Sequence, residues 1–176
     1  GRQELSEMVD AVVAAVENGD SEALVALLDL TDLECVAQPT RGRPLCPEGT
    51  APGVLVRVFP YASGCTTNYV QNDRALLRHN LDEVIGQPEP WVHYATGLTD
   101  GIWHELPIDA VVIFESPGRP ELDLQLGVVA AGVRKLARGC GGTPQTDAAA
   151  FANFLRPPPT TTPGAEPPRL VSCPAE

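Results

Sequence analysis

The spacing of apolar residues changes near residue 85, and this change limits the fold more than any other feature of the sequence. Before that point apolar side chains recur at helical spacing, which predicts three amphipathic helices. The first stripe precedes Gly19 and comprises Leu5, Met8, Val9, Val12, Val13 and Val16. The second follows the N-cap candidates Asp20 and Ser21 and comprises Leu24, Leu27 and Leu28. The third ends at Gly86 and Pro88 and comprises Leu76, Leu77, Leu81, Val84 and Ile85.

After residue 85 the apolar residues alternate with polar ones or follow one another, which predicts β-strands. The predicted strands span residues 91–96, 108–114, 122–128 and 133–137. Their links are short and rich in turn formers, so we expect consecutive antiparallel strands in a meander. A further strand is expected at residues 54–59 and a weak one at residues 33–37. The polar residues 63–68 are expected to connect strand 54–59 to the third helix.

This order of elements predicts an α+β domain. The N-terminal helices and the third helix are expected to pack on a curved antiparallel sheet that disulfides stabilise. Residues 1–156 form the single domain, and a brief helix runs from Thr146 to Leu155 at its end. Residues 157–176 have the composition of a Pro-rich linker and form a C-terminal tail.

The charge balance and the length of the apolar runs argue against a nucleic-acid partner and against a membrane span. Of the 176 residues, 23 are acidic and 12 are basic, which gives a formal net charge of -11. Nucleic-acid binding depends on clustered cations, whereas the arginines here are scattered and Lys135 is the single lysine. The longest weakly polar run, Leu124 to Val133, is far shorter than the ~20 residues of a membrane-spanning helix. We therefore expect no nucleic-acid partner and no membrane span in this chain.

The five cysteines form neither C-x-x-C pairs nor zinc-ligand spacings with His, so no metal site is predicted. Cys35 and Cys46 bracket a loop rich in Pro and Gly, while Cys65 and Cys140 each follow a Gly just beyond a predicted strand. We predict a disulfide within each of these two pairs, although other pairings remain open. Cys173 stays free, links two chains into a homodimer, or replaces an assumed partner. Such bridges indicate an extracytoplasmic protein, and the alternative is a reduced intracellular protein with incidental thiols.

The order of elements resembles the cone-shaped fold of the nuclear transport factor 2-like superfamily, also called SnoaL-like or cystatin-like. The resemblance rests on residues 5–29, with their "ENGDSEAL" junction, and on the helix and strands of residues 72–138. It implies a pocket at the wide end of a cone formed by the sheet and the helices. Members of this superfamily include isomerases, dehydratases and epoxide hydrolases, as well as many binding or accessory domains without catalysis.

A candidate catalytic pair follows from what this resemblance implies, a carboxylate or a His and Asp pair inside the cone. Asp109 and Glu115 lie on an otherwise apolar face of strand 108–114, and His93 on the preceding strand is expected to approach Asp109 across the sheet. Such a pair abstracts a proton or activates water. The alternative is that both carboxylates mark the solvent ends of the strand, with His93 and His104 at the surface.

Four other residues are candidates for ligand binding. Asn80 lies on the apolar stripe of the third helix, where it either lines the pocket or satisfies a backbone group. Trp91, Tyr94 and Trp103 crowd one short region, where they either hold an apolar ligand or fill the core. Serine-hydrolase and zincin motifs are absent from the sequence, and no cofactor is predicted.

These patterns together favour an exported cell-envelope or extracellular binding or accessory domain without catalysis. The alternative is a small-molecule isomerase, lyase or hydrolase that uses His93 and Asp109. The partner is expected to be a small molecule or an envelope protein. The preference for Arg over Lys and the abundance of Ala, Gly and Pro indicate a bacterial source.

Overall fold

The computed structural model describes residues 1–40, 42–63, 66–86, 91–97, 102–103, 106–115, 124–138 and 154–156. The three predicted helices are confirmed as α1 (Arg2–Glu17), α2 (Ser21–Ala26) and α3 (Arg74–Ile85). Helices α2 and α3 each begin with a side-chain N-cap. The Asp20 carboxylate accepts a hydrogen bond from the N–H of Ala23 at 2.9 Å, and Asp73 accepts bonds from the N–H groups of Ala75 and Leu76.

The strands form one large mixed sheet and one small sheet. They are β1 (Thr31–Glu34), β2 (Leu55–Ser63), β3 (Thr66–Gln71), β4 (Val92–Gly97), β5 (Ile102–Trp103), β6 (Leu106–Pro107), β7 (Ala110–Glu115), β8 (Leu124–Val129), β9 (Gly132–Arg138) and β10 (Phe154–Arg156). The predicted meander is confirmed, because β4, β7, β8 and β9 are antiparallel neighbours in that order. Strands β5 and β6 pair separately.

The prediction of a purely antiparallel sheet is wrong, because β2 pairs with β9 in parallel. Tyr61 lies opposite Leu136, and Ser63 lies opposite Arg138. Parallel neighbours need a long crossover connection, and the chain between β2 and β9, which includes α3 and the meander, supplies it. The fold is therefore α+β with a mixed sheet.

Two strands replace elements that the sequence predicted differently. Strand β3 forms a hairpin with β2 where a connection was expected, with Ser63 opposite Thr66. Strand β10 pairs with β4 at Phe154, so the expected helix does not extend through Leu155. In both places short apolar or β-branched runs pair with an available strand edge, and sequence periodicity does not show such long-range pairing.

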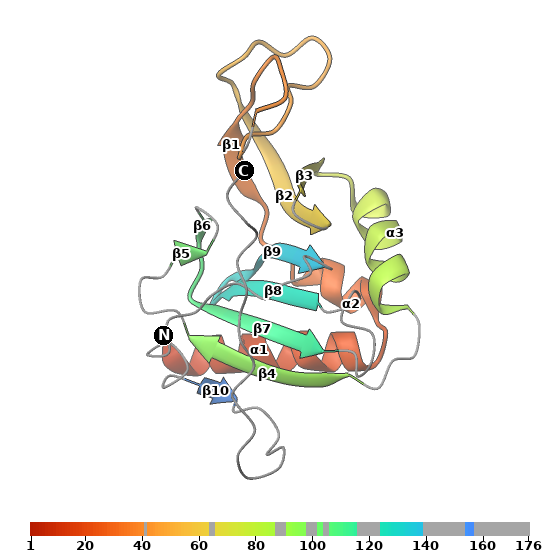
Figure 1. Cartoon of the computed structure of the whole chain (residues 1–176), viewed down its shortest axis with the longest axis vertical. Helices are drawn as coiled ribbons and strands as arrows, with labels where there is room; N and C mark the ends of the chain where they lie inside the picture. The colour runs from red at the N-terminus through yellow and green to blue at the C-terminus, as the bar shows by residue number, and fades with distance from the viewer. Residues whose placement is uncertain are drawn as a thin grey trace.

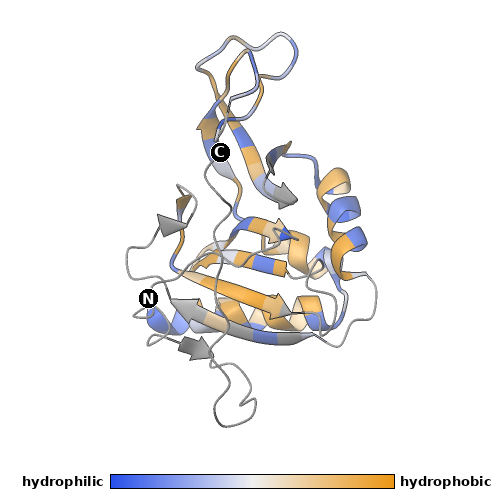
Figure 2. Cartoon of the chain, in the orientation of Figure 1, coloured by the Kyte–Doolittle hydropathy of each residue, from blue (hydrophilic) through white to orange (hydrophobic). Residues whose placement is uncertain are grey.

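The main core lies between α1 and one face of the large sheet (Figure 1). Figure 2 shows the apolar residues of α1 and β7 gathered in this layer. Its fully buried members from the helix and the central strands are Val9, Val12, Val16, Val112, Phe114, Leu124 and Leu126. Each such side chain contributes about 1.5–3 kcal/mol by leaving water, and this layer therefore fixes α1 on the sheet.

The apolar stripe of α3 is narrower than the sequence predicted. Leu77, Leu81, Val84 and Ile85 are buried, but Leu76 is 46% exposed. Leu76 lies in the first turn of α3, three residues after the capping residue Asp73 and close to the end of β3.

The opposite face of the sheet is also buried. Val111 and Ile113 of β7 are almost fully covered, and so are Gln125 of β8 and Lys135 of β9. This explains why β7 reads as a continuous apolar run, since both of its faces leave water.

The two strands β1 and β2 extend beyond the body of the sheet as a projecting arm (Figure 1). The arm comprises residues 31–40 and 42–57 of the described chain. The predicted Cys35–Cys46 disulfide closes its loop, with the two Sγ atoms 2.05 Å apart. Gly53, at a φ of +88°, donates its N–H to the carbonyl of Cys35, while Cys35 donates to Val54. This is a glycine β-bulge, and it fixes the return of the chain into β2.

Several sequence-based predictions fall outside the described residues. Cys65, Cys140, Cys173, His104 and the tail of residues 157–176 are among them. Within the described helices, none has both the length and the apolar character that a membrane span needs.

Candidate functional site

His93 pairs with Glu17 of α1. The Nδ1 atom of His93 lies 2.8 Å from a carboxylate oxygen of Glu17, and the His93 side chain is 22% exposed. The imidazole also lies against Phe114, with ring centroids 5.9 Å apart. A carboxylate that holds one imidazole nitrogen orients the ring and leaves Nε2 as the atom able to exchange a proton.

The structure does not bring His93 and Asp109 together. In the register of β4 and β7, His93 lies opposite Phe114, whereas Ala110 lies opposite Gly97. Asp109 precedes Ala110, so at least four residues of β4, about 13 Å, separate it from His93 along the sheet. Asp109 is exposed, and its N–H donates to the carbonyl of Val128.

The four candidate ligand-binding residues lie in different parts of the fold. Trp91 is half-buried and makes an edge contact with Phe114, with ring centroids 6.2 Å apart, so it serves the core. Asn80 is half-buried on α3, and Trp103 belongs to the small β5–β6 sheet at the other side of the molecule (Figure 1). Tyr94 lies opposite Ile113 in the β4–β7 register, and the described atoms do not include the Tyr94 or Trp103 side chains.

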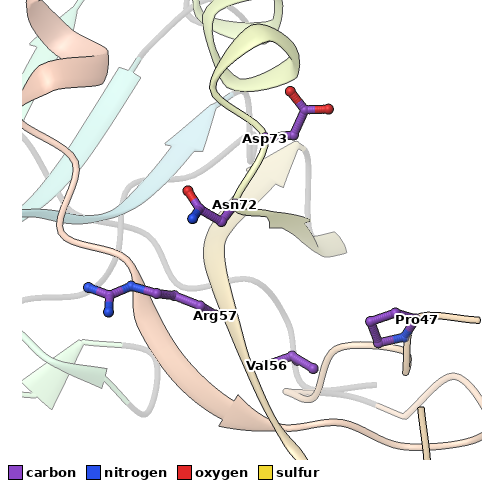
Figure 3. A pocket seen from close by; sticks show the side chains of 5 residues that line it. All are labelled: Pro47, Val56, Arg57, Asn72 and Asp73. Atoms are coloured by element: carbon purple, nitrogen blue, oxygen red, sulfur yellow. The ribbon is translucent and has the colours of Figure 1, made fainter. Parts of the chain in front are cut away.

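A cavity lies where the arm meets the first turn of α3. It is open, has a volume of about 370 Å³, and is lined by Pro47, Val56, Arg57, Asn72 and Asp73. Figure 3 shows Val56 directed toward Pro47, whereas Arg57 and Asn72 point to a common side. Asp73 points toward α3, which it caps. The cavity thus lies between the arm and the turn that precedes α3.

The end of β3 creates this cavity. Strand β3 follows β2 only as far as the pair Val58 and Gln71, after which the chain turns through Asn72 and Asp73 into α3. Because β3 stops there, Val56 and Arg57 of β2 have β1 on one side and line the cavity on the other.

Arg57 is the cation of this cavity. Its side chain is exposed, and its register partner on β1 is Asp32. No ion pair joins Arg57 to Asp32 or to another carboxylate of the described chain. By contrast, Arg43 of the arm contacts Glu34 at 2.6 Å. Arg57 is therefore available to an anionic group that enters the cavity.

The arm also carries most of the large exposed apolar side chains of the described chain. Its large exposed apolar side chains are Leu45, Val54 and Leu55, at 50%, 46% and 63% exposure, and Leu76 on α3 completes the set. Single exposed apolar side chains are ordinary in soluble proteins, whereas several in one region mark a surface that meets a partner. The arm is therefore the strongest candidate for an interaction surface.

Sequence reasoning missed Glu17, Arg57 and Asn72. Arg57 interrupts an otherwise apolar strand, and Asn72 precedes the N-cap Asp73, so both left local signals. Glu17 left none, because its contact with His93 depends on how α1 crosses the sheet. Among the described residues no cluster of three His, Cys, Asp or Glu side chains is placed to hold a metal ion.

Comparisons with models of known protein families, with curated proteins and with solved structures give no match for this chain. The resemblance to the nuclear transport factor 2-like superfamily thus stays a prediction, and function is inferred from the geometry of the chain itself.

Proposed function

We propose that this chain is an extracytoplasmic binding or accessory domain that contacts a partner protein through its arm. The observation that carries the proposal is the concentration of exposed Leu45, Val54 and Leu55 on a projecting hairpin that a disulfide closes. The disulfide restrains the arm, which therefore presents these side chains with less loss of conformational freedom on binding.

The disulfide also supports the proposed location. Bonded cysteines persist in secreted and envelope proteins, whereas cytosolic reductants keep most thiols free. In the Cys35–Cys46 bond, Cys35 is buried and Cys46 is half-buried.

Site-specific photo-cross-linking tests this function. Leu45 is replaced by p-benzoyl-phenylalanine in cells that produce the protein, and Ala14, exposed on α1, is replaced in a matched control. We expect a cross-linked partner from position 45 and none from position 14, in the extracytoplasmic fraction. Recovery of the protein in the cytosol with free Cys35 and Cys46, or equal cross-linking from both positions, would contradict the proposal.

A second candidate is a small-molecule isomerase, lyase or hydrolase, and the contact between His93 and Glu17 favours it. In this case His93 acts as the general base and Glu17, rather than Asp109, orients it. His79 and Glu83, an exposed pair on α3 at 3.7 Å, give a matched control. An activity found on ester, epoxide or ketone substrates should be lost in His93→Gln and kept in His79→Gln if this candidate is correct.

A further inference from the structure

Among the residues that the structure describes, the start of β2 has a strand neighbour on one side only. Strand β1 pairs with Leu55 through Val58, but β3 pairs only from Val58 onward. At Leu55 the described chain therefore supplies a strand on the β1 side alone, and the open cavity lies next to this edge.

The backbone of Leu55 is directed toward this free side. The carbonyl of Val54 accepts a hydrogen bond from the N–H of Cys35 at 2.9 Å, so it points toward β1. In a trans peptide the following N–H points the opposite way, and within the described chain no peptide bond is cis. The N–H of Leu55 thus faces away from β1, and its carbonyl does the same in an extended strand.

The side chains along this edge divide between the two faces of the strand. Val54 and Val56 lie on one face, whereas Leu55 and Arg57 lie on the other, because successive residues alternate. Arg57 is exposed and makes no ion pair within the described chain. The nearest carboxylate of the cavity, Asp73, accepts bonds from the first turn of α3 and points toward that helix.

We propose that an extended segment of a partner protein pairs with β2 at Leu55 and occupies the open cavity. The segment places an acidic side chain beside Arg57 and an apolar one beside Val56, since directly opposed residues of neighbouring strands interact most strongly. Strand addition of this kind draws affinity from backbone hydrogen bonds and specificity from the alternating side chains. The inference rests on the proposed function, and it names the recognition chemistry of the arm.

The probe is a synthetic, fluorescent peptide of Thr and Val with one central Glu, compared with matched peptides that carry Gln or Lys. We expect saturable binding of the Glu peptide to the full chain by fluorescence anisotropy, about fivefold tighter than the Gln peptide. Amide hydrogen exchange at Leu55 should slow on binding. Equal binding of all three peptides, or preference for Lys, would overturn the proposal.

Two variants separate backbone pairing from side-chain contact. Leu55→Pro removes the N–H and should weaken binding about tenfold, whereas Leu55→Ala keeps the N–H and should weaken it less. A third variant, Arg57→Glu, changes an exposed side chain and leaves the backbone as it is. It should make the chain prefer the Lys peptide over the Glu peptide. An equal loss in Leu55→Ala and Leu55→Pro would assign the contact to the side chain and overturn strand addition.

Other occupants of the edge give distinct results. Protection of the Leu55 amide without peptide that grows with protein concentration would make a second copy the occupant. Protection that disappears when residues 157–176 are removed would make the tail the occupant. Either result, or no peptide binding at all, overturns this inference, while cross-linking from Leu45 still reports separately on the proposed function.

Discussion

Ser63 and Arg138 are register partners where β2 and β9 run in parallel. Cys65 follows Ser63 by two residues, and Cys140 follows Arg138 by the same step. The predicted Cys65–Cys140 disulfide involves residues just beyond these partners, outside the part of the chain that the structure describes, and it stays a prediction.

Peptide mapping without reduction should recover Cys65 and Cys140 in one linked peptide. The Cys35–Cys46 peptide, whose bond the structure contains, is the internal control. If Cys65 reacts with an alkylating agent in native protein while Cys35 and Cys46 stay protected, the predicted bond is absent.

Removing the arm disulfide should destabilise the arm more than the body. The bond closes a loop with a sequence separation of 11, for which chain entropy predicts a loss of about 3 kcal/mol in unfolding free energy. In Cys35→Ser/Cys46→Ser, amide exchange should rise across the arm and stay unchanged in α1. A uniform rise across both regions would show that the arm is not a separate unit of local opening.

Gly132 at the start of β9 should not tolerate a side chain. A Cβ there would lie 2.4 Å from the carbonyl oxygen of Leu27, and its φ is +154°. Gly132→Ala should lower the unfolding free energy by about 1–3 kcal/mol or more. Gly49→Ala is the matched control, since Gly49 also has a positive φ but nothing within 4 Å of an added Cβ. Equal losses in urea denaturation would mean that the contact with Leu27 contributes nothing.

Two leucines of α3 should differ strongly when shortened. Leu81 is 2% exposed and Leu76 is 46% exposed, although both belong to the stripe that the sequence predicts. Leu81→Ala should cost about 2–5 kcal/mol in unfolding free energy, while Leu76→Ala should cost far less. The same urea measurement checks both, and a large loss from Leu76→Ala would show that this side chain is buried in solution.

Local sequence signals predicted the helices and the meander, because amphipathic periodicity and capping residues such as Asp20 act over a few residues. They did not predict β3. Its first residues, Thr66 and Thr67, are polar and have the composition of a connection, and they form a strand because they pair with β2. The candidate pair of His93 and Asp109 was chosen from alternation alone. Alternation gives the face of a strand but not the register, and the register determines which residues meet.

The joint between the N-terminal helices and β9 has a consequence for the order of folding. Asp29 receives a hydrogen bond from Arg134 at 2.7 Å, and its own N–H donates to the carbonyl of Val133. The contacts of the N-terminal helices are thus complete only when β9 has formed, since Arg134 lies 105 residues after Asp29 in the chain. Contacts between residues so far apart in sequence form slowly. Docking of the N-terminal helices onto the sheet is therefore expected to be a late step in folding, because it requires β9.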